Sequence, residues 1–243
     1  MYVIAVANPK GGTGKTTVSL LLAEEIARAG GNACVLDCDP NQNVVEWKAG
    51  RDAEGRATPF EVVPRPREDD VVDWIDGAAS SYDFLIVDLE GTAAQIVTFV
   101  LARADLVLIP FEPSPMEARQ AARAFQLVRR TEKVIRRTIA QGAVFTRTNA
   151  AFATSEEKAV RRELEGTDVE LLGVSLVKRA AFQRIFRDDL LLHELSAREV
   201  SNLEAAKANS ALFSQAVVEL LTRSGAPARP RGTDNGETPA RAA

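Results

Sequence analysis

Short apolar runs alternate with longer amphipathic stretches along most of this 243-residue chain. The runs are rich in Val, Ile and Leu with few polar positions, which is typical of strands that are covered on both faces. They predict strands over Tyr2–Ala7, Ala33–Cys38, Phe60–Val63, Phe84–Leu89, Leu106–Ile109, Ala143–Thr146 and Leu171–Val177. The alternation predicts a single α/β domain, built on a mainly parallel, twisted sheet with helices on both faces.

The amphipathic stretches between these runs predict the helices. They cover Thr16–Arg28, Ala93–Arg103, Glu117–Arg137, Ser155–Glu165 and Asn209–Arg223. The residues after the last stretch include Pro, Gly, Thr, Arg and Ala and almost no large apolar side chain, so they cannot bury enough surface to fold. We therefore expect a folded domain over residues 1–222 and a disordered tail over residues 223–243.

Composition adds constraints on where the protein works. No apolar run approaches the roughly 20 residues that span a bilayer, and no leader segment precedes the first predicted strand. Cys34 and Cys38 lie in one predicted strand, about 13 Å apart by strand rise, which is too far for a disulfide. These features predict a reduced, cytoplasmic protein that does not enter a membrane.

The loop between the first strand and the first helix carries the main candidate chemistry. Residues 9–17 read Pro-Lys-Gly-Gly-Thr-Gly-Lys-Thr-Thr. Glycines let successive backbone N–H groups point at phosphate oxygens, and the following helix adds its positive end. Lys15 would lie along the β- and γ-phosphates, and the Thr16 hydroxyl would ligate Mg²⁺. The alternative, a glycine-rich turn that binds nothing, fits the strand–loop–helix context less well. The predicted nucleotide-binding residues are Lys10, Gly11, Gly12, Thr13, Gly14, Lys15, Thr16 and Thr17.

This loop departs from the ordinary phosphate-loop pattern at its start. Pro9 stands where the pattern has glycine, and Lys10 adds a second lysine. Since a cation there has no role in forming the turn, it indicates a negatively charged partner. The loop closely resembles the deviant Walker A motif of the ParA/MinD family of ATPases. The resemblance implies a P-loop NTPase fold that binds ATP and Mg²⁺. It also implies that Lys10 reaches across a nucleotide-sandwich dimer and stabilises transition-state charge, as an arginine finger does.

Two further segments extend the resemblance. Residues 35–43, Val-Leu-Asp-Cys-Asp-Pro-Asn-Gln-Asn, are similar to the family's switch after the second strand, and residues 83–88 resemble its Walker B segment. By position Asp39 would orient the attacking water, Asp37 would support the metal shell, and Asp88 would contact Mg²⁺ through water. The alternative for the first two is that they cap the next helix. After Asp88 the family continues with Thr-Pro-Pro or a close relative, whereas this chain has Leu-Glu-Gly-Thr at 89–92, which leaves the hydrolysis rate open.

The resemblance covers roughly residues 2–222 and points to one branch of the family. A start at the phosphate-loop strand leaves no room for an N-terminal helix-turn-helix, and the absence of cysteine after Cys38 argues against the iron–sulfur branches. The tail lacks the basic amphipathic membrane helix of MinD-like proteins. A metabolic synthetase of related fold would use the same phosphates, but Lys10 and the switch favour a small ParA that segregates plasmids, chromosomes or protein clusters. The second relative is the VirC1 type, an ATP-bound scaffold in DNA transfer with little hydrolysis.

The distribution of charge bears on DNA binding. The net charge of −4 does not suggest a nucleic-acid partner, yet residues 118–187 hold 15 Lys/Arg and 7 Asp/Glu, a net of +8. The resemblance implies an ATP-dependent homodimer that binds DNA nonspecifically, associates with the nucleoid when ATP-bound, and is stimulated by a ParB-like or other adaptor protein. The predicted DNA contacts are Arg147, Arg179 and Arg184. The alternative is a helical stripe of Arg119, Arg123, Arg130 and Arg137, which can also be a solvated outer face.

Overall fold

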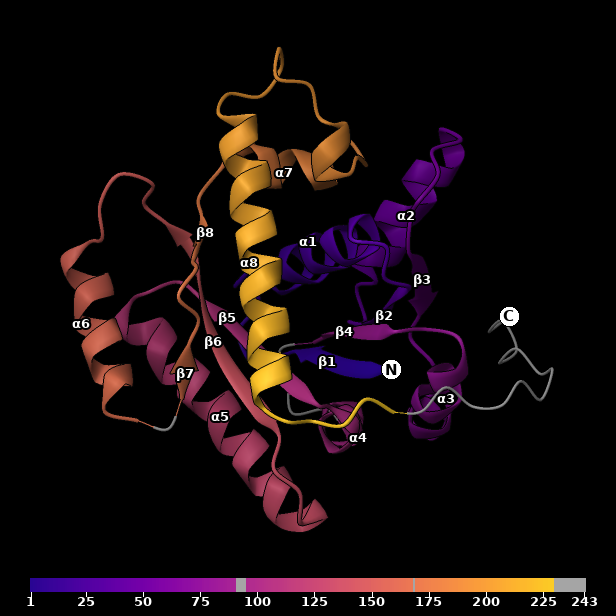
Figure 1. Cartoon of the computed structure of the whole chain (residues 1–243), viewed down its shortest axis with the longest axis vertical. Helices are drawn as coiled ribbons and strands as arrows, with labels where there is room; N and C mark the ends of the chain where they lie inside the picture. The colour runs from indigo at the N-terminus through magenta and orange to yellow at the C-terminus, as the bar shows by residue number, and fades with distance from the viewer. Residues whose placement is uncertain (91–94, 168, 230–243) are drawn as a thin grey trace.

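A parallel sheet lies at the centre of the molecule, between two layers of helices (Figure 1). The computed structural model describes residues 1–90, 95–167 and 169–229. The strands are β1 (Tyr2–Val6), β2 (Ala33–Cys38), β3 (Glu61–Pro64), β4 (Phe84–Leu89), β5 (Leu106–Phe111), β6 (Ala140–Thr148), β7 (Glu170–Leu171) and β8 (Leu176–Val177). Their order is β3-β2-β4-β1-β5-β6-β7, β8 also pairs with β6, and each pairing is parallel. The predicted α/β class is confirmed.

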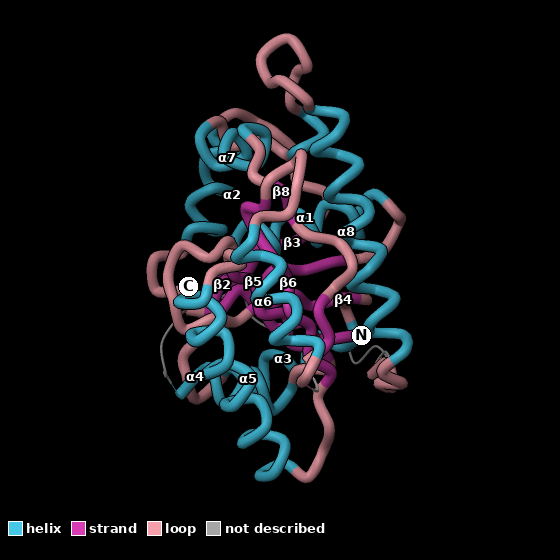
Figure 2. The backbone as a smooth tube through the Cα atoms, turned by 90° about the vertical axis from the view of Figure 1, so that its left-hand side faces the viewer, coloured by secondary structure: helices cyan, strands magenta, loops and turns pink. Residues whose placement is uncertain are grey.

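The helices cover both faces of this sheet. They are α1 (Lys15–Arg28), α2 (Asn43–Ala53), α3 (Val71–Gly77), α4 (Gln95–Arg103), α5 (Pro115–Ile135), α6 (Ser155–Glu165), α7 (Ala180–Arg187) and α8 (Leu203–Arg223). Side chains from α1, α2, α7 and α8 form the core on one face, and side chains from α3, α4, α5 and α6 form the core on the other. Figure 2 shows the strands enclosed between these helices. Within the described ranges, no helix is long and apolar enough to cross a membrane.

The first strand shows why the predicted strands are apolar along their whole length. Ile4 and Val6 enter one core and Val3 and Ala5 enter the other, and all four are fully buried. Because successive side chains of a strand point to opposite faces, a strand between two helical layers needs apolar residues at both sets of positions. Because the strands of this sheet are parallel, their carboxyl ends all lie at one edge, where loops can form a site.

The C-terminal half departs from the predicted elements in several places. The prediction of one strand over Leu171–Val177 is wrong, because β7 and β8 are separate two-residue strands that pair with different parts of β6. The β6–β8 register shifts around Arg147, whose φ of 53° is left-handed. Helix α5 ends at Ile135, since Arg136 also adopts a left-handed φ of 54° at the C-cap. Arg137 therefore leaves the predicted helical stripe.

Residues 224–229, which belong to the predicted tail, have a defined place. The amino group of Met1 donates to the carbonyl of Arg229 at 2.6 Å, and the Arg229 N–H donates to the carbonyl of Met1 at 2.9 Å. The Arg229 guanidinium lies 3.5 Å from Asp76 of α3. In Figure 1 this yellow segment runs from α8 past α4 toward α3. These contacts join residues remote in sequence, so composition does not show them; residues 230–243 lie outside the described part of the chain.

Candidate nucleotide-binding site

The loop that joins β1 to α1 has the backbone geometry of a phosphate cradle. Gly12 and Gly14 adopt φ of 76° and 95°, conformations in which side-chain-bearing residues are strained. A Cβ placed on Gly11 or Gly12 would meet nothing within 4 Å, so the backbone here borders open space. The far end of the loop is anchored, since the Thr146 hydroxyl on β6 donates to the carbonyl of Thr13 at 2.9 Å. A fixed loop beside open space at the start of a helix can hold phosphate oxygens.

Lys15 lies at the first position of α1, surrounded by carboxylates. The residue is 7% exposed, and its ammonium donates to the carbonyl of Lys10 at 3.2 Å. Burial lowers the pKa of Lys15, and the charges of Asp88, Asp39 and Glu90 oppose that shift. The structure thus brings together Lys15, Asp39 and Asp88, which the sequence had placed on three separate segments. It also brings Glu90, the carboxylate that departs from the family pattern, close enough to act electrostatically on the Lys15 ammonium.

Asp88 provides the observation that tests for a magnesium ion. It lies one residue before the end of β4 at 1% exposure, with Oδ1 accepting from the Ser19 hydroxyl at 3.2 Å. Its Oδ2 is buried and has no hydrogen-bond partner among the described residues. Burial raises the pKa of Asp88 to about 7, against the effect of the Thr16 hydroxyl. A buried acceptor beside a hydroxyl fits Mg²⁺, which prefers oxygen ligands and keeps several waters.

The protein groups alone do not enclose a metal. In the described part of the chain, no group of three or more His, Cys, Asp or Glu side chains could hold one. Thr16 and Asp88 would therefore share the ion with phosphate oxygens and water, as is usual for Mg²⁺ bound with a nucleotide.

The two aspartates of the switch have different surroundings. Asp37 is fully buried, and its Oδ2 accepts the N–H groups of Val44 at 2.8 Å and Val45 at 3.2 Å. This is the helix-capping geometry considered as the alternative, and support of a metal shell by Asp37 stays a prediction. Asp39 is half-buried, and its Oδ1 accepts the N–H and the side-chain amide of Asn41, each at 2.9 Å. Asp39 is therefore held in the β2–α2 loop, within the electrostatic reach of Lys15.

A cavity of about 190 Å³ adjoins the phosphate loop at Gly14 and Thr17. The end of β6, β8 and α7 supply the rest of its lining, which includes Phe182 and Phe186, one helical turn apart. Arg179 also lines it, with a buried Nε that has no partner among the described residues. The sequence pattern did not predict this cavity. The spacing of the two phenylalanines after Lys178-Arg179 was the available signal.

The three arginines predicted to contact DNA lie in two environments. Arg147 and Arg179 line the cavity beside the phosphate loop, and Arg147 donates to Glu112 at 2.6 Å. Arg184 lies on α7, where it pairs with Asp188 and, at 3.3 Å, with Glu199. Arg147 and Arg184 are thus paired with carboxylates, and contact of the three arginines with DNA stays a prediction.

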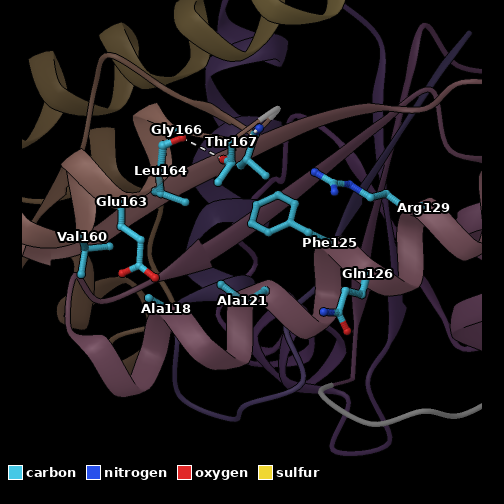
Figure 3. Close-up of a pocket in the computed structure, with 12 residues that line it drawn as sticks. Ala118, Ala121, Phe125, Gln126, Arg129, Val160, Glu163, Leu164, Gly166 and Thr167 are labelled. Carbon is cyan, nitrogen blue, oxygen red and sulfur yellow. Dashed lines mark hydrogen bonds between the residues drawn. The ribbon is translucent and has the colours of Figure 1, made fainter.

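A larger cavity of about 410 Å³ lies between α5 and α6. Figure 3 shows Ala121, Phe125 and Arg129 of α5 on one side and Leu164 and Thr167 on the other. No residue of the phosphate loop or of the switches lines it, and most of its side chains are small or apolar. The residues that line each cavity, and not the cavity volumes, therefore assign the nucleotide to the sheet edge that carries the phosphate loop. We call this edge the phosphate-loop edge.

Comparison with known proteins agrees with this geometry. The family described as the CobQ/CobB/MinD/ParA nucleotide binding domain matches residues 4–192. The chain is also 35% identical to Protein ParA of Rhizobium radiobacter over 228 residues, which covers 91% of this chain and 98% of that protein. The chain belongs to the ParA/MinD family of partition ATPases.

Two further relatives show how far the likeness extends. Protein virC1 of Rhizobium rhizogenes is 24% identical over 130 residues, covering 53% of this chain and 56% of that protein. The ATP complex of a McdA variant from Cyanothece superposes with a TM-score of 0.70 at 16% identity, covering 90% of this chain and 96% of that chain. The predicted P-loop fold is confirmed, and within the family the ParA relative matches over more of the chain than virC1 does.

Proposed function

We propose that this ParA/MinD-family member dimerises when it binds ATP and Mg²⁺, binds DNA nonspecifically as the dimer, and thereby positions a plasmid, chromosome or protein-cluster cargo. A ParB-like or other adaptor protein would stimulate hydrolysis and release the DNA. The observation that carries the proposal is the open phosphate loop, in which Lys15 lies within the field of the buried Asp88 and Lys10 supplies a second cation. The 35% identity to a ParA over nearly the whole chain supports the same branch.

Each residue of the site has a separate proposed role in nucleotide binding or hydrolysis. Backbone N–H groups of residues 11–16 and the Lys15 ammonium would hold the phosphates. Bound Mg²⁺, shared by Thr16 and Asp88, would neutralise charge on the phosphate oxygens. Asp39 would orient the attacking water, and Lys10 would act on the nucleotide of a second copy. The cavity beside Gly14 and Thr17 would take the nucleoside, with Phe182 and Phe186 as apolar walls and Arg179 donating from its Nε, which has no partner among the described residues.

DNA binding is assigned first to the outer face of α5. Arg119, Arg123 and Arg130 are exposed on this helix, in the stretch that carries a net charge of +8. Phosphate contacts by such arginines give affinity without sequence preference and a strong dependence on salt. Arg147, Arg179 and Arg184 remain the second set, because two of them line the proposed nucleoside cavity and the third is paired with carboxylates.

A specific observation favours a second candidate function. Glu90 adds a carboxylate to the field of Lys15, and repulsion between this carboxylate and a γ-phosphate would slow hydrolysis. The protein would then act as an ATP-bound scaffold of the VirC1 type in DNA transfer, with little turnover.

Sedimentation and turnover measurements test both candidates. With ATP and Mg²⁺ the protein should sediment as a dimer and retain DNA, and with ADP it should do neither. Turnover that rises with DNA and with the product of an adjacent reading frame supports the partition ATPase. Turnover that stays low with both supports the scaffold, and a monomer in saturating ATP would refute both.

A further inference from the structure

Lys10 and Glu117 form an ion pair that joins the phosphate loop to α5, although they are 107 residues apart in the sequence. The lysine side chain is 41% exposed, whereas the glutamate side chain is 9% exposed. The Lys10 backbone is also fixed, since its N–H donates to the Asn8 side chain at 3.0 Å, and the Asn8 amide donates to the carbonyl of Pro110 at 2.8 Å. Lys10 is therefore held to β5 through its backbone and to α5 through its ammonium.

From this contact we propose that Glu117 is the positioning residue of Lys10. It holds the ammonium against α5 in the nucleotide-free chain and releases it when Lys10 engages the nucleotide of a second copy. This inference rests on the proposed ATP-dependent dimer, and it adds the residue that controls when Lys10 is available.

The surroundings of Glu117 allow the lysine to leave. Glu117 lies in the first turn of α5, after Ser114, whose hydroxyl accepts the Glu117 N–H at 3.3 Å. A carboxylate at the N-terminus of a helix is stabilised by the helix dipole, so the lysine is not the only group that compensates its charge. Its Oε2 is buried and has no partner among the described residues, so the lysine contacts only one of the two oxygens. A single contact by a half-exposed lysine is weak enough for a triphosphate to displace.

The ion pair consequently makes dimerisation depend on nucleotide. Without ATP, the carboxylate is the nearest anion for Lys10, and Lys15 beside it donates to the Lys10 carbonyl. A triphosphate brings several negative charges to the same edge and competes with Glu117 for the ammonium. Removal of the carboxylate should therefore free Lys10 early and favour the dimer.

The first experiment measures whether Glu117 holds Lys10, with no nucleotide present. The wild type, Glu117→Gln and Glu156→Gln are acylated with an amine-reactive reagent, and labelling of Lys10 is followed by peptide mass spectrometry. Lys48, which pairs with Asp52 on α2, is the internal reference. Glutamine is well tolerated near a helix N-terminus, so α5 should still form. We expect Lys10 to react about fivefold faster in Glu117→Gln, from the usual strength of a half-exposed ion pair.

Glu156→Gln is the matched control, because Glu156 is an exposed glutamate in the first turn of α6 and loses the same charge. It should label like the wild type. Equal Lys10 labelling in all three proteins would overturn the proposal, as would faster labelling in both variants.

The second experiment measures dimerisation by sedimentation with a non-hydrolysable ATP analogue. The protein concentration at half-dimerisation should fall about fivefold in Glu117→Gln and stay unchanged in Glu156→Gln. An unchanged or higher value in Glu117→Gln would overturn the release step. A wild type that stays monomeric would overturn the proposed function and this release step, whereas the labelling result would still decide whether Glu117 holds Lys10.

Discussion

The phosphate-loop edge and the basic stretch of residues 118–187 differ in how far their sequences predict their structure. In the loop, glycine conformations and the start of α1 place Lys15 beside Asp88, as the motif predicts. In the basic stretch, several arginines are paired with carboxylates whose positions the charge count does not locate. Arg147 pairs with Glu112, and Arg137 lies 3.5 Å from Asp105. A backbone motif is local information, whereas the availability of a surface charge is decided by distant partners.

Loss of the Lys15 ammonium should produce the largest effect at the phosphate-loop edge. In Lys15→Ala, ATP affinity should fall by at least about 100-fold, because a buried cation that pairs with phosphate is removed. Isothermal titration with ATP and Mg²⁺ measures this. Lys48→Ala on α2 is the control and should bind like the wild type; tight binding by Lys15→Ala would refute the loop assignment.

Asp39→Ala should separate hydrolysis from binding. Turnover should fall about 100-fold, the scale of a lost proton acceptor or water-orienting group, while the ATP dimer persists and still binds DNA. Steady-state phosphate release and sedimentation report the two properties. The exposed Asp69 provides a matched control in Asp69→Ala. Unchanged phosphate release in Asp39→Ala would remove Asp39 from the hydrolytic role.

The pKa of Asp88 predicts a pH dependence at the same edge. Because burial raises this pKa from 3.8 to about 7, Asp88 is largely protonated at pH 6 and must lose that proton to accept a cation. Apparent Mg²⁺ affinity in the presence of ATP should therefore rise roughly tenfold between pH 6 and pH 8.

The same pKa shift makes the stability of the ligand-free chain change with pH in the opposite direction to Mg²⁺ affinity. Its contribution to the free energy of unfolding is present at low pH and is lost as pH rises through 7, since ionisation is disfavoured in the folded state. Asp88→Asn should remove both trends, and a Mg²⁺ affinity that is flat with pH in the wild type would contradict the assignment.

The smallest expected effects lie in the basic stretch and compare its two sets of arginines. Arg119→Glu on α5 should weaken DNA binding several-fold and lower the salt slope by about 1, without changing ATP-dependent dimerisation. Arg147→Glu should weaken ATP binding as well, because Arg147 lines the proposed nucleoside cavity. Filter binding over a salt series and ATP titration distinguish the two variants.

Arg198→Glu supplies the matched control outside the basic stretch and should leave both properties unchanged. If Arg147→Glu weakens only DNA binding and Arg119→Glu weakens neither property, the DNA surface lies at the β6 end instead.

The sequence by itself determined the fold class and the position of the phosphate loop. Continuous apolar runs such as Tyr2–Ala7 mark strands buried on both faces, and the glycines of the loop allow left-handed backbone, so both signals are local. Tertiary structure decided the rest through contacts between remote residues. The pairing with β6 divides the predicted strand at 171–177, and Glu117 holds Lys10 across 107 positions. Which anion a cation contacts depends on packing, because the sequence specifies the charges and only the fold sets the distances between them.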